Sequence, residues 1–222
     1  MTETSRTEPT PTPDTKEYTA RTIPVHVELG SQETVLLLRE AEKILRDASA
    51  IALGPCICRV TEQNCDAPID TCLALNSASA EMVQTQPGFR YVDVETALKA
   101  LEASHKAGLV HLAFRKPGAE VTEFCSCCSC CCWFFKELKP LKYSNGIVAS
   151  SHIARHDADR CVGCGVCVQR CAFKAWRTEA GADKPTFDPD RCFGCGVCVS
   201  TCPSGAITLV PRAPHASAPS AG

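Results

Sequence analysis

The chain has 222 residues, a formal net charge of −2 and eighteen cysteines. A charge this close to neutral argues against nucleic acid or an anionic membrane as a partner, and no apolar run approaches the roughly eighteen residues that a membrane-spanning helix needs. The opening MTETSRTEPTPTPDTKE has neither the basic nor the apolar region of a secretory signal. We therefore expect a protein of the reducing cytoplasm whose cysteines bind metal.

The first part of the chain predicts a disordered tail, a strand and a helix. Residues 1–17 are rich in Thr, Pro and Glu and have almost nothing to bury, so we expect them to be disordered. Residues 18–30 partly alternate apolar and polar side chains, which predicts a short strand, and Pro24 favours the edge of a sheet. Residues 31–53 carry apolar side chains at helical spacing and predict a helix that Gly54 ends.

Two groups of cysteines follow. The first has the spacing Cys-x-Cys-x6-Cys-x6-Cys among turn-forming residues and consists of Cys56, Cys58, Cys65 and Cys72. Asp93 then predicts the N-terminal cap of a helix over 94–107, and LVHLAF at 109–114 predicts a buried strand or extended segment. The second group is the run CSCCSCCC, with an apolar WFF after it, and contains Cys125, Cys127, Cys128, Cys130, Cys131 and Cys132. We expect residues 18–145 to form a mainly helical, Cys-rich domain in which the two groups meet.

The C-terminal part, residues 146–210, contains an internal repeat of 31 residues. CVGCGVCVQRC and CFGCGVCVSTC both have the spacing Cys-x2-Cys-x2-Cys-x3-Cys, and each starts after Asp-x-Asp-Arg. Three thiolates on one tight loop can hold three corners of an iron–sulfur cubane, whereas the fourth points away and reaches the other cluster in a two-fold arrangement. This predicts two crossed ligand sets, which are Cys161, Cys164, Cys167 with Cys202, and Cys192, Cys195, Cys198 with Cys171.

The glycines between these cysteines permit left-handed backbone where a loop wraps a cluster. With these motifs, residues 151–210 resemble the bacterial-type ferredoxins with two [4Fe–4S] clusters. Pro203 matches the proline that the family places after the fourth cysteine, whereas Ala172 departs from it and the connector between the repeats is longer than in the shortest members. The resemblance implies a small ferredoxin-like α+β fold, two [4Fe–4S] clusters and electron transfer. Disulfides would need an oxidising compartment, and zinc ribbons usually use paired Cys-x2-Cys knuckles, so neither explains these eight cysteines as well.

Around the repeats, the sequence predicts short hairpins. In ferredoxin-like modules a strand before the first cysteine pairs with a strand after the last, and SSHIARHD at 150–157 and AITLV at 206–210 are the natural pair. The connector at 173–188 predicts a hairpin around Ala180 and Gly181. Residues 211–222 predict a disordered tail.

The other ten cysteines lie in the N-terminal half. Adjacent side chains in the run at 125–132 point in different directions, so we expect two to four of them to bind metal together with some of the first group. We interpret them as the site of a third iron–sulfur cluster, with a zinc site or a thiol–disulfide switch as alternatives. The CxCR and CSCCSCCC signatures are similar to those of ferredoxin-containing proteins of anaerobic metabolism, a resemblance that implies cluster binding and no more.

We expect an electron-transfer protein or subunit, rather than an enzyme, that shuttles single electrons to a redox partner such as a flavin- or metal-containing oxidoreductase. Residues 157–210 carry six basic and six acidic side chains, which favours a fixed module in a larger assembly over a freely diffusing acidic ferredoxin. One alternative is a reductase whose N-terminal cluster binds a small substrate in a pocket lined by Trp133 and Phe134. Another is a redox sensor or cluster carrier.

Overall fold

The structure is a computed structural model that describes residues 19–22, 33–115, 120–138 and 147–212. The tails expected to be disordered lie outside these residues, apart from 211–212, and so does most of the strand expected at 18–30, of which only β1 (Thr19–Thr22) is described. None of the helices in the described ranges has both the length and the apolar character needed to span a bilayer.

Seven strands of the described residues form one sheet in the order β4-β2-β3-β6-β5-β1-β7. After β1 they are β2 (Ile51–Pro55), β3 (Asp70–Leu75), β4 (Arg90–Tyr91), β5 (Val110–Arg115), β6 (Val121–Cys127) and β7 (Ile147–Val148). Neighbouring strands are antiparallel except β1 and β7, which are parallel.

Five helices of the described residues accompany this sheet. They are α1 (Glu33–Asp47), α2 (Ile57–Glu62), α3 (Ser77–Thr85), α4 (Val94–Lys106) and α5 (Trp133–Leu138). The fold is compatible with an α+β protein, but a mainly helical N-terminal domain is not supported, because the helices pack on a large sheet. The helix expected over 31–53 ends at Asp47 for the same reason, since the residues after it form the buried strand β2.

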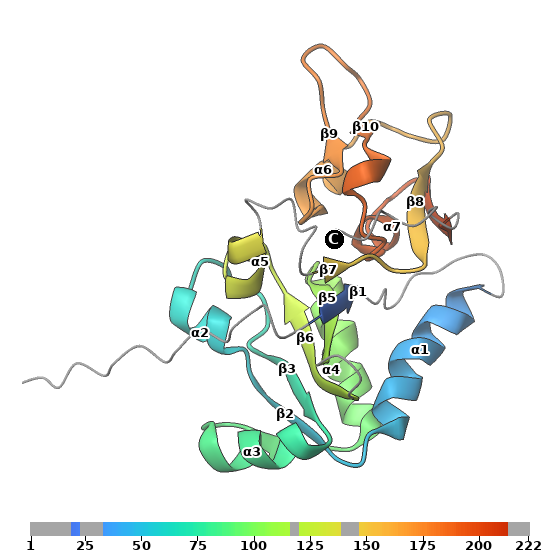
Figure 1. Cartoon of the computed structure of the whole chain (residues 1–222). Coiled ribbons are helices and arrows are strands. Elements are labelled where there is room, and N and C mark those ends of the chain that lie inside the picture. The colour runs from blue at the N-terminus through green and yellow to red at the C-terminus, as the bar shows by residue number, and fades with distance from the viewer. Residues whose placement is uncertain (1–18, 23–32, 116–119, 139–146, 213–222) are drawn as a thin grey trace, which may run out of the picture.

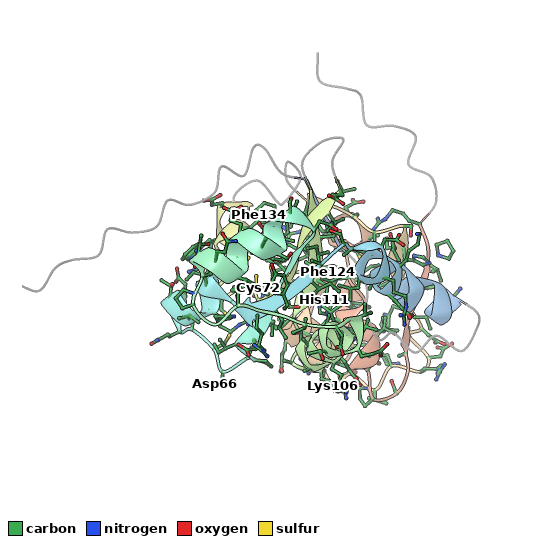
Figure 2. The ribbon with its side chains drawn as sticks, turned by 90° about the horizontal axis from the view of Figure 1, so that it is seen from below. Asp66, Cys72, Lys106, His111, Phe124 and Phe134 are labelled. Atoms are coloured by element: carbon green, nitrogen blue, oxygen red, sulfur yellow. The ribbon has the colours of Figure 1, made fainter. Side chains whose placement is uncertain are left out.

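Side chains alternate between the two faces of the sheet, and each face has its own core. On one face, Leu73 and Phe124 are fully buried against Leu45 of α1 and Leu101 of α4. On the other face, the side chains of β5 and the end of β6 pack against α5, while α3 covers the β2–β3 half. In Figure 2, which views the molecule from below, Lys106 at the end of α4 and Phe134 of α5 lie on opposite sides of the sheet. The second face carries the cysteines of β3 and β6.

Two predictions for the region between the cysteine groups are confirmed. Asp93 caps α4, since its carboxylate accepts a hydrogen bond of 2.8 Å from the amide of Thr96. The segment predicted at 109–114 forms all of the buried strand β5 except its last residue. These elements bring the run at 125–132 back across the sheet toward the first cysteine group.

The C-terminal module has the two predicted pairings. Strand β8 (His152–His156) pairs with β11 (Ile207–Pro211), and β9 (Trp176–Arg177) pairs with β10 (Thr186–Phe187), both antiparallel. The short helices α6 (Val166–Arg170) and α7 (Val197–Ser200) each follow a cysteine loop, and a 3-10 turn, η2 (Pro189–Arg191), precedes the second loop. Figure 1 shows this module, with α6, α7, β9 and β10 in orange and red, beyond the end of the sheet where β1, β5 and β7 lie.

The module and the sheet share one apolar core. Phe173 stacks on Phe193 with ring centroids 4.4 Å apart, and the ring of Phe173 also lies 5.3 Å from that of Phe135 in α5. Val197 of α7 is buried in the same cluster as the side chains of β5. The second cysteine loop of the module is therefore packed directly against the sheet and α5, in the part of the chain that contains the other ten cysteines.

Candidate metal centres

The first three cysteines of the first repeat lie with the last cysteine of the second. Cys161, Cys164, Cys167 and Cys202 line one small cavity of about 20 Å³ at the surface of the module. Cys164 is exposed, whereas Cys167 is buried at the start of α6. The fourth cysteine of the first repeat, Cys171, is not among the residues that line this cavity.

Cys171 instead lies with the second loop. Burial raises the pKa of Cys195 to about 12, and the negative charges of Cys171 and Cys192 add to this effect. The pKa of Cys198 is also raised by burial first and then by Cys195, Cys192 and Cys171. Cys171 and Cys195 both pack against the apolar core described above, which places the fourth cysteine of the first repeat beside the second loop.

The backbone around both loops is arranged for sulfur ligands. The amides of Ala175 and Ala206 donate hydrogen bonds of 3.3 Å to the thiols of Cys171 and Cys202, which stand four residues earlier in their repeats. Gly194 has a φ of +69°, and a Cβ atom on it would lie 2.1 Å from the carbonyl oxygen of His152. Only glycine fits there, so the loop can pack against the strand before the first cysteine. Eight thiols on two such loops fit the donor set of iron–sulfur clusters, whose sulfurs accept amide hydrogen bonds.

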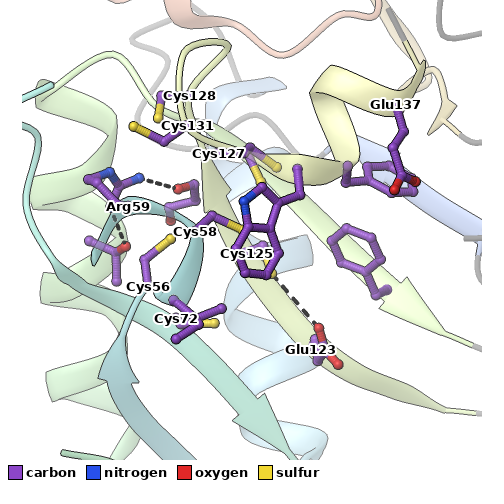
Figure 3. A pocket seen from close by; sticks show the side chains of 17 residues that line it. Cys56, Cys58, Arg59, Cys72, Glu123, Cys125, Cys127, Cys128, Cys131 and Glu137 are labelled. Atoms are coloured by element: carbon purple, nitrogen blue, oxygen red, sulfur yellow. Dashed lines mark hydrogen bonds between the residues drawn. The ribbon is translucent and has the colours of Figure 1, made fainter. Parts of the chain in front are cut away.

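A larger cavity of about 170 Å³ lies in the N-terminal domain between α2, β3, β6 and α5. Phe114, Trp133 and Phe134 form an apolar wall, and Figure 3 shows the cysteines around the remaining sides. Eight cysteines from both N-terminal groups line it, namely Cys56, Cys58, Cys72, Cys125, Cys127, Cys128, Cys131 and Cys132. The two cysteine groups thus meet in space, as expected, and the aromatic side chains of the WFF segment border the place where they meet.

Six of these thiols form a continuous chain of neighbours, in the order Cys56, Cys58, Cys132, Cys127, Cys125 and Cys72. The hydrogen bond with Cys132 is the first cause that raises the pKa of Cys58, to about 11. The hydrogen bond with Cys127 comes first in lowering the pKa of Cys132. The remaining links are hydrogen bonds of the same kind, between Cys56 and Cys58, Cys127 and Cys125, and Cys125 and Cys72.

The other four thiols form a compact group of their own, made of Cys65, Cys128, Cys130 and Cys131. All four sulfurs lie within 4.8 Å of one another. Cys65 Sγ is 3.8 Å from both Cys128 Sγ and Cys131 Sγ, and Cys131 Sγ is 3.8 Å from Cys130 Sγ. Burial opposes ionisation of Cys128, but hydrogen bonds from the Cys131 amide, from Cys130 and from a neighbouring guanidinium outweigh it and lower the pKa of this thiol to about 7.

That guanidinium belongs to Arg59, whose side chain is only 1 % exposed. It donates hydrogen bonds to the carbonyl oxygen of Pro68, to Thr71 Oγ1 at 3.1 Å and to the carbonyl oxygen of Ser126 at 2.9 Å. Burial opposes its charge, but the thiols of Cys56, Cys128 and Cys65 outweigh it and raise the pKa of Arg59. Figure 3 shows Arg59 between Cys56 on one side and Cys128 and Cys131 on the other. The groups that offset the cost of burying this cation are thus cysteines rather than carboxylates.

The sequence did not predict how the ten N-terminal cysteines divide into six and four, nor the role of Arg59. The only signal for Arg59 is its place directly after the first cysteine pair in the segment CICR. The division depends on β6, whose alternating side chains direct Cys125 and Cys127 to the cavity before the turn at 128–131 begins.

Comparison with known proteins identifies one part of the chain. A family model described as a 4Fe-4S dicluster domain matches residues 160–206, which include all eight cysteines of the repeat. A search of curated proteins gave no match. Residues 160–206 are thus an iron–sulfur domain of the ferredoxin type, near the C-terminus of the described residues.

Proposed function

We propose that this protein, with its ferredoxin-type domain at 160–206, is an electron-transfer protein or subunit that passes single electrons between a partner and a third cluster in its N-terminal domain. When bound, the iron–sulfur clusters accept and donate one electron at a time. The observation that carries the proposal is the shared apolar core. Cys171 and Cys195 of the ferredoxin-type domain and Cys127 and Cys132 of the N-terminal cavity all pack in or against this single cluster.

We assign two crossed ligand sets to the ferredoxin-type domain. The cavity shared by Cys161, Cys164, Cys167 and Cys202 supports the first set. The second is supported by the packing of Cys171 and Cys195 against one apolar cluster, and by the charges of Cys171 and Cys192, which raise the pKa of both Cys195 and Cys198. The matching amide-to-sulfur hydrogen bonds at the two fourth cysteines support equivalent roles for Cys171 and Cys202.

The six-thiol chain is the proposed site of the third cluster. Its thiols line a cavity that Trp133 and Phe134 close on one side, and such burial tunes a reduction potential. Arg59 adds a second indication, because its Nε atom is buried without a hydrogen-bond partner among the described residues and its side chain lines this cavity. A buried donor of this kind is satisfied when an acceptor such as sulfide fills the adjoining space.

The two ligand sets of the ferredoxin-type domain differ in how far they are exposed to solvent. Cys164 is exposed and its neighbour Val162 is 68 % exposed, so a partner can approach the first set from solvent. The second set lies on the side where Phe173, Phe193 and Phe135 connect the module to the N-terminal domain. The first set therefore faces the redox partner, and the second set faces the N-terminal cavity.

The first test is the iron and acid-labile sulfide content of the full-length protein purified without oxygen. About eight irons per chain are expected if only the repeats bind clusters and about twelve if the N-terminal cavity holds a third cubane. The number of sulfide ions per chain should equal the number of iron atoms in these clusters. Colourless protein without sulfide would contradict the proposal.

The second test addresses the crossed ligand sets with two double variants. Cys164→Ala with Cys202→Ala removes two ligands of one proposed set, so one of the two C-terminal clusters should persist. Cys164→Ala with Cys171→Ala removes one ligand from each set, so both C-terminal clusters should be lost or converted. Electron paramagnetic resonance of the reduced proteins measures the outcome. Equal damage in the two double variants would contradict the crossed assignment.

A second candidate function is a reductase, and the N-terminal cavity is the observation that favours it. Its volume of about 170 Å³ leaves room beside the six thiols, and Glu123 and Glu137 place acidic groups on its wall. In that case, carbon monoxide or cyanide, which bind open iron sites, should shift the spectrum of the N-terminal cluster. Spectra that do not change with either molecule favour the electron carrier.

A further inference from the structure

We infer that Cys65, Cys128, Cys130 and Cys131 bind a single metal ion in tetrahedral coordination, as a site separate from the iron–sulfur clusters. This proposal goes beyond electron transfer and stands whether or not the six-thiol cavity holds a cluster. It assigns the ten N-terminal cysteines to two sites with different chemistry instead of to one.

The spacing of the sulfurs is that of one ion. A tetrahedral metal with metal–sulfur bonds of about 2.3 Å has its four sulfurs about 3.8 Å apart. Three of the six sulfur–sulfur separations within this group are 3.8 Å, and the other three are at most 4.8 Å. In a cubane each thiolate binds its own iron atom, so the same four sulfurs would have to spread farther apart.

The cysteines of the repeats provide an internal comparison. All eight lie in the described residues, yet no three of them have sulfurs that are mutually within 4.8 Å. The loops of a known cluster-binding family thus hold their sulfurs more widely than this group does. The six-thiol chain that lines the N-terminal cavity also contains no such trio.

The four ligands join two segments that are distant in the sequence. Cys65 lies in the irregular segment between α2 and β3, whereas the other three lie in the turn after β6. Asn64 reinforces the junction, because its Nδ2 atom donates a hydrogen bond of 3.1 Å to the carbonyl oxygen of Cys130. Cys65 and Cys130 do not line the large cavity, while Cys128 and Cys131 do. The ion would therefore sit behind the cavity wall and fix the turn from which Cys127 and Cys132 reach into the cavity.

Charge and donor type define the class of ion. Four thiolates around a divalent ion carry a net charge of −2, which the buried Arg59 offsets in part. Thiolates select soft or borderline ions such as zinc or iron and disfavour magnesium and calcium. Because the protein supplies all four ligands, no position remains for substrate or water, so the role is structural.

The test measures zinc, iron and acid-labile sulfide in the same full-length protein purified without oxygen. We expect either one zinc ion per chain or, if iron occupies the site, one iron in excess of sulfide, because the cubanes contain iron and sulfide in equal numbers. Zinc X-ray absorption should then give four sulfur neighbours at about 2.3 Å. Iron equal to sulfide with no zinc in the wild-type protein would overturn the proposal without any variant.

Two matched variants locate the ion. Cys65→Ser should remove about one metal ion per chain and leave sulfide unchanged, whereas Cys56→Ser, in the six-thiol chain, should keep that ion. Iron and sulfide lost in equal amounts from Cys65→Ser would show a cluster at this group and overturn the single-ion site. Zinc retained in full by Cys65→Ser would also overturn it. The metal and sulfide contents expected for these variants do not depend on whether the repeats transfer electrons. The single-ion site and the electron-transfer function can therefore be refuted independently.

Discussion

Arg59 offers a quantitative test of how the N-terminal cysteines are held. We consider its replacement by methionine, which keeps much of the side chain's length and removes its charge and donors. The guanidinium donates to three oxygen atoms and lies among the thiols of both proposed N-terminal sites. Arg90 provides a matched control, because it pairs with Asp70 at 3.2 Å while both side chains are more than half exposed.

The two substitutions differ in expected magnitude. Hydrogen bonds that involve a charged group contribute about 1.5–3 kcal/mol each, and removing one partner of a buried charge pairing costs about 3–5 kcal/mol. We therefore expect Arg59→Met to destabilise the protein by about 3–5 kcal/mol. In a chain of this size each kcal/mol lowers the thermal midpoint by about 2–4 °C, so the midpoint should fall by about 10 °C. Arg90→Met should lower it by about 4 °C or less, since an exposed ion pair contributes at most about 1 kcal/mol.

The assay is thermal unfolding without oxygen, followed by circular dichroism, with metal content measured in parallel. Arg59→Met should also lose metal from the N-terminal domain while the clusters of the repeats remain. Arg59→Lys retains the charge but cannot reach all three oxygen acceptors, so its midpoint should lie between those of the wild type and Arg59→Met. Equal midpoints for Arg59→Met and Arg90→Met, with unchanged metal content, would refute this account of the buried guanidinium.

Two further predictions concern the backbone and the helix cap. Gly194→Ala should destabilise the second cysteine loop much more than Gly165→Ala destabilises the first. Both glycines have positive φ, but a Cβ atom at Gly194 would collide with the carbonyl oxygen of His152, whereas nothing lies within 4 Å of a Cβ atom at Gly165. Loss of the clusters on heating measures the difference, and equal losses in the two variants would contradict the prediction. Hydrogen bonds from Thr96 lower the pKa of Asp93 below 3.8, so the stability that this cap adds is complete above that pH and is lost as the pH falls through the lowered pKa. The difference in thermal midpoint between the wild type and Asp93→Ala should therefore stay constant from pH 8 to pH 5, and a difference that vanishes within that range would be inconsistent with the cap.

The C-terminal module was predictable because its chemistry and its spacing coincide. The eight cysteines recur at fixed separations, and the two strand pairs follow from where the loops begin and end. The cap at Asp93 was predictable for a similar reason, since one short-range hydrogen bond decides it.

The N-terminal domain was less predictable because its cysteines serve two purposes at once. In β6, Cys125 and Cys127 are residues of an alternating strand as well as cavity-lining thiols, so the dense run concealed the period of two that indicates a strand. Strand β2 was merged with the helix before it, because its side chains are buried on both faces and do not alternate in hydrophobicity. The division of the thiols depends on contacts between residues more than sixty positions apart, which spacing alone does not encode.

The most direct test of the central claim is a reductive titration of the full-length protein without oxygen, followed by electron paramagnetic resonance and related to its iron and sulfide content. Electron transfer through iron–sulfur clusters predicts reversible uptake of electrons in single steps, with signals from the two clusters of the repeats and a further signal that Cys56→Ser abolishes. Protein that takes up no electrons, that holds zinc at the eight cysteines of the repeats, or that has these cysteines as disulfides would contradict it.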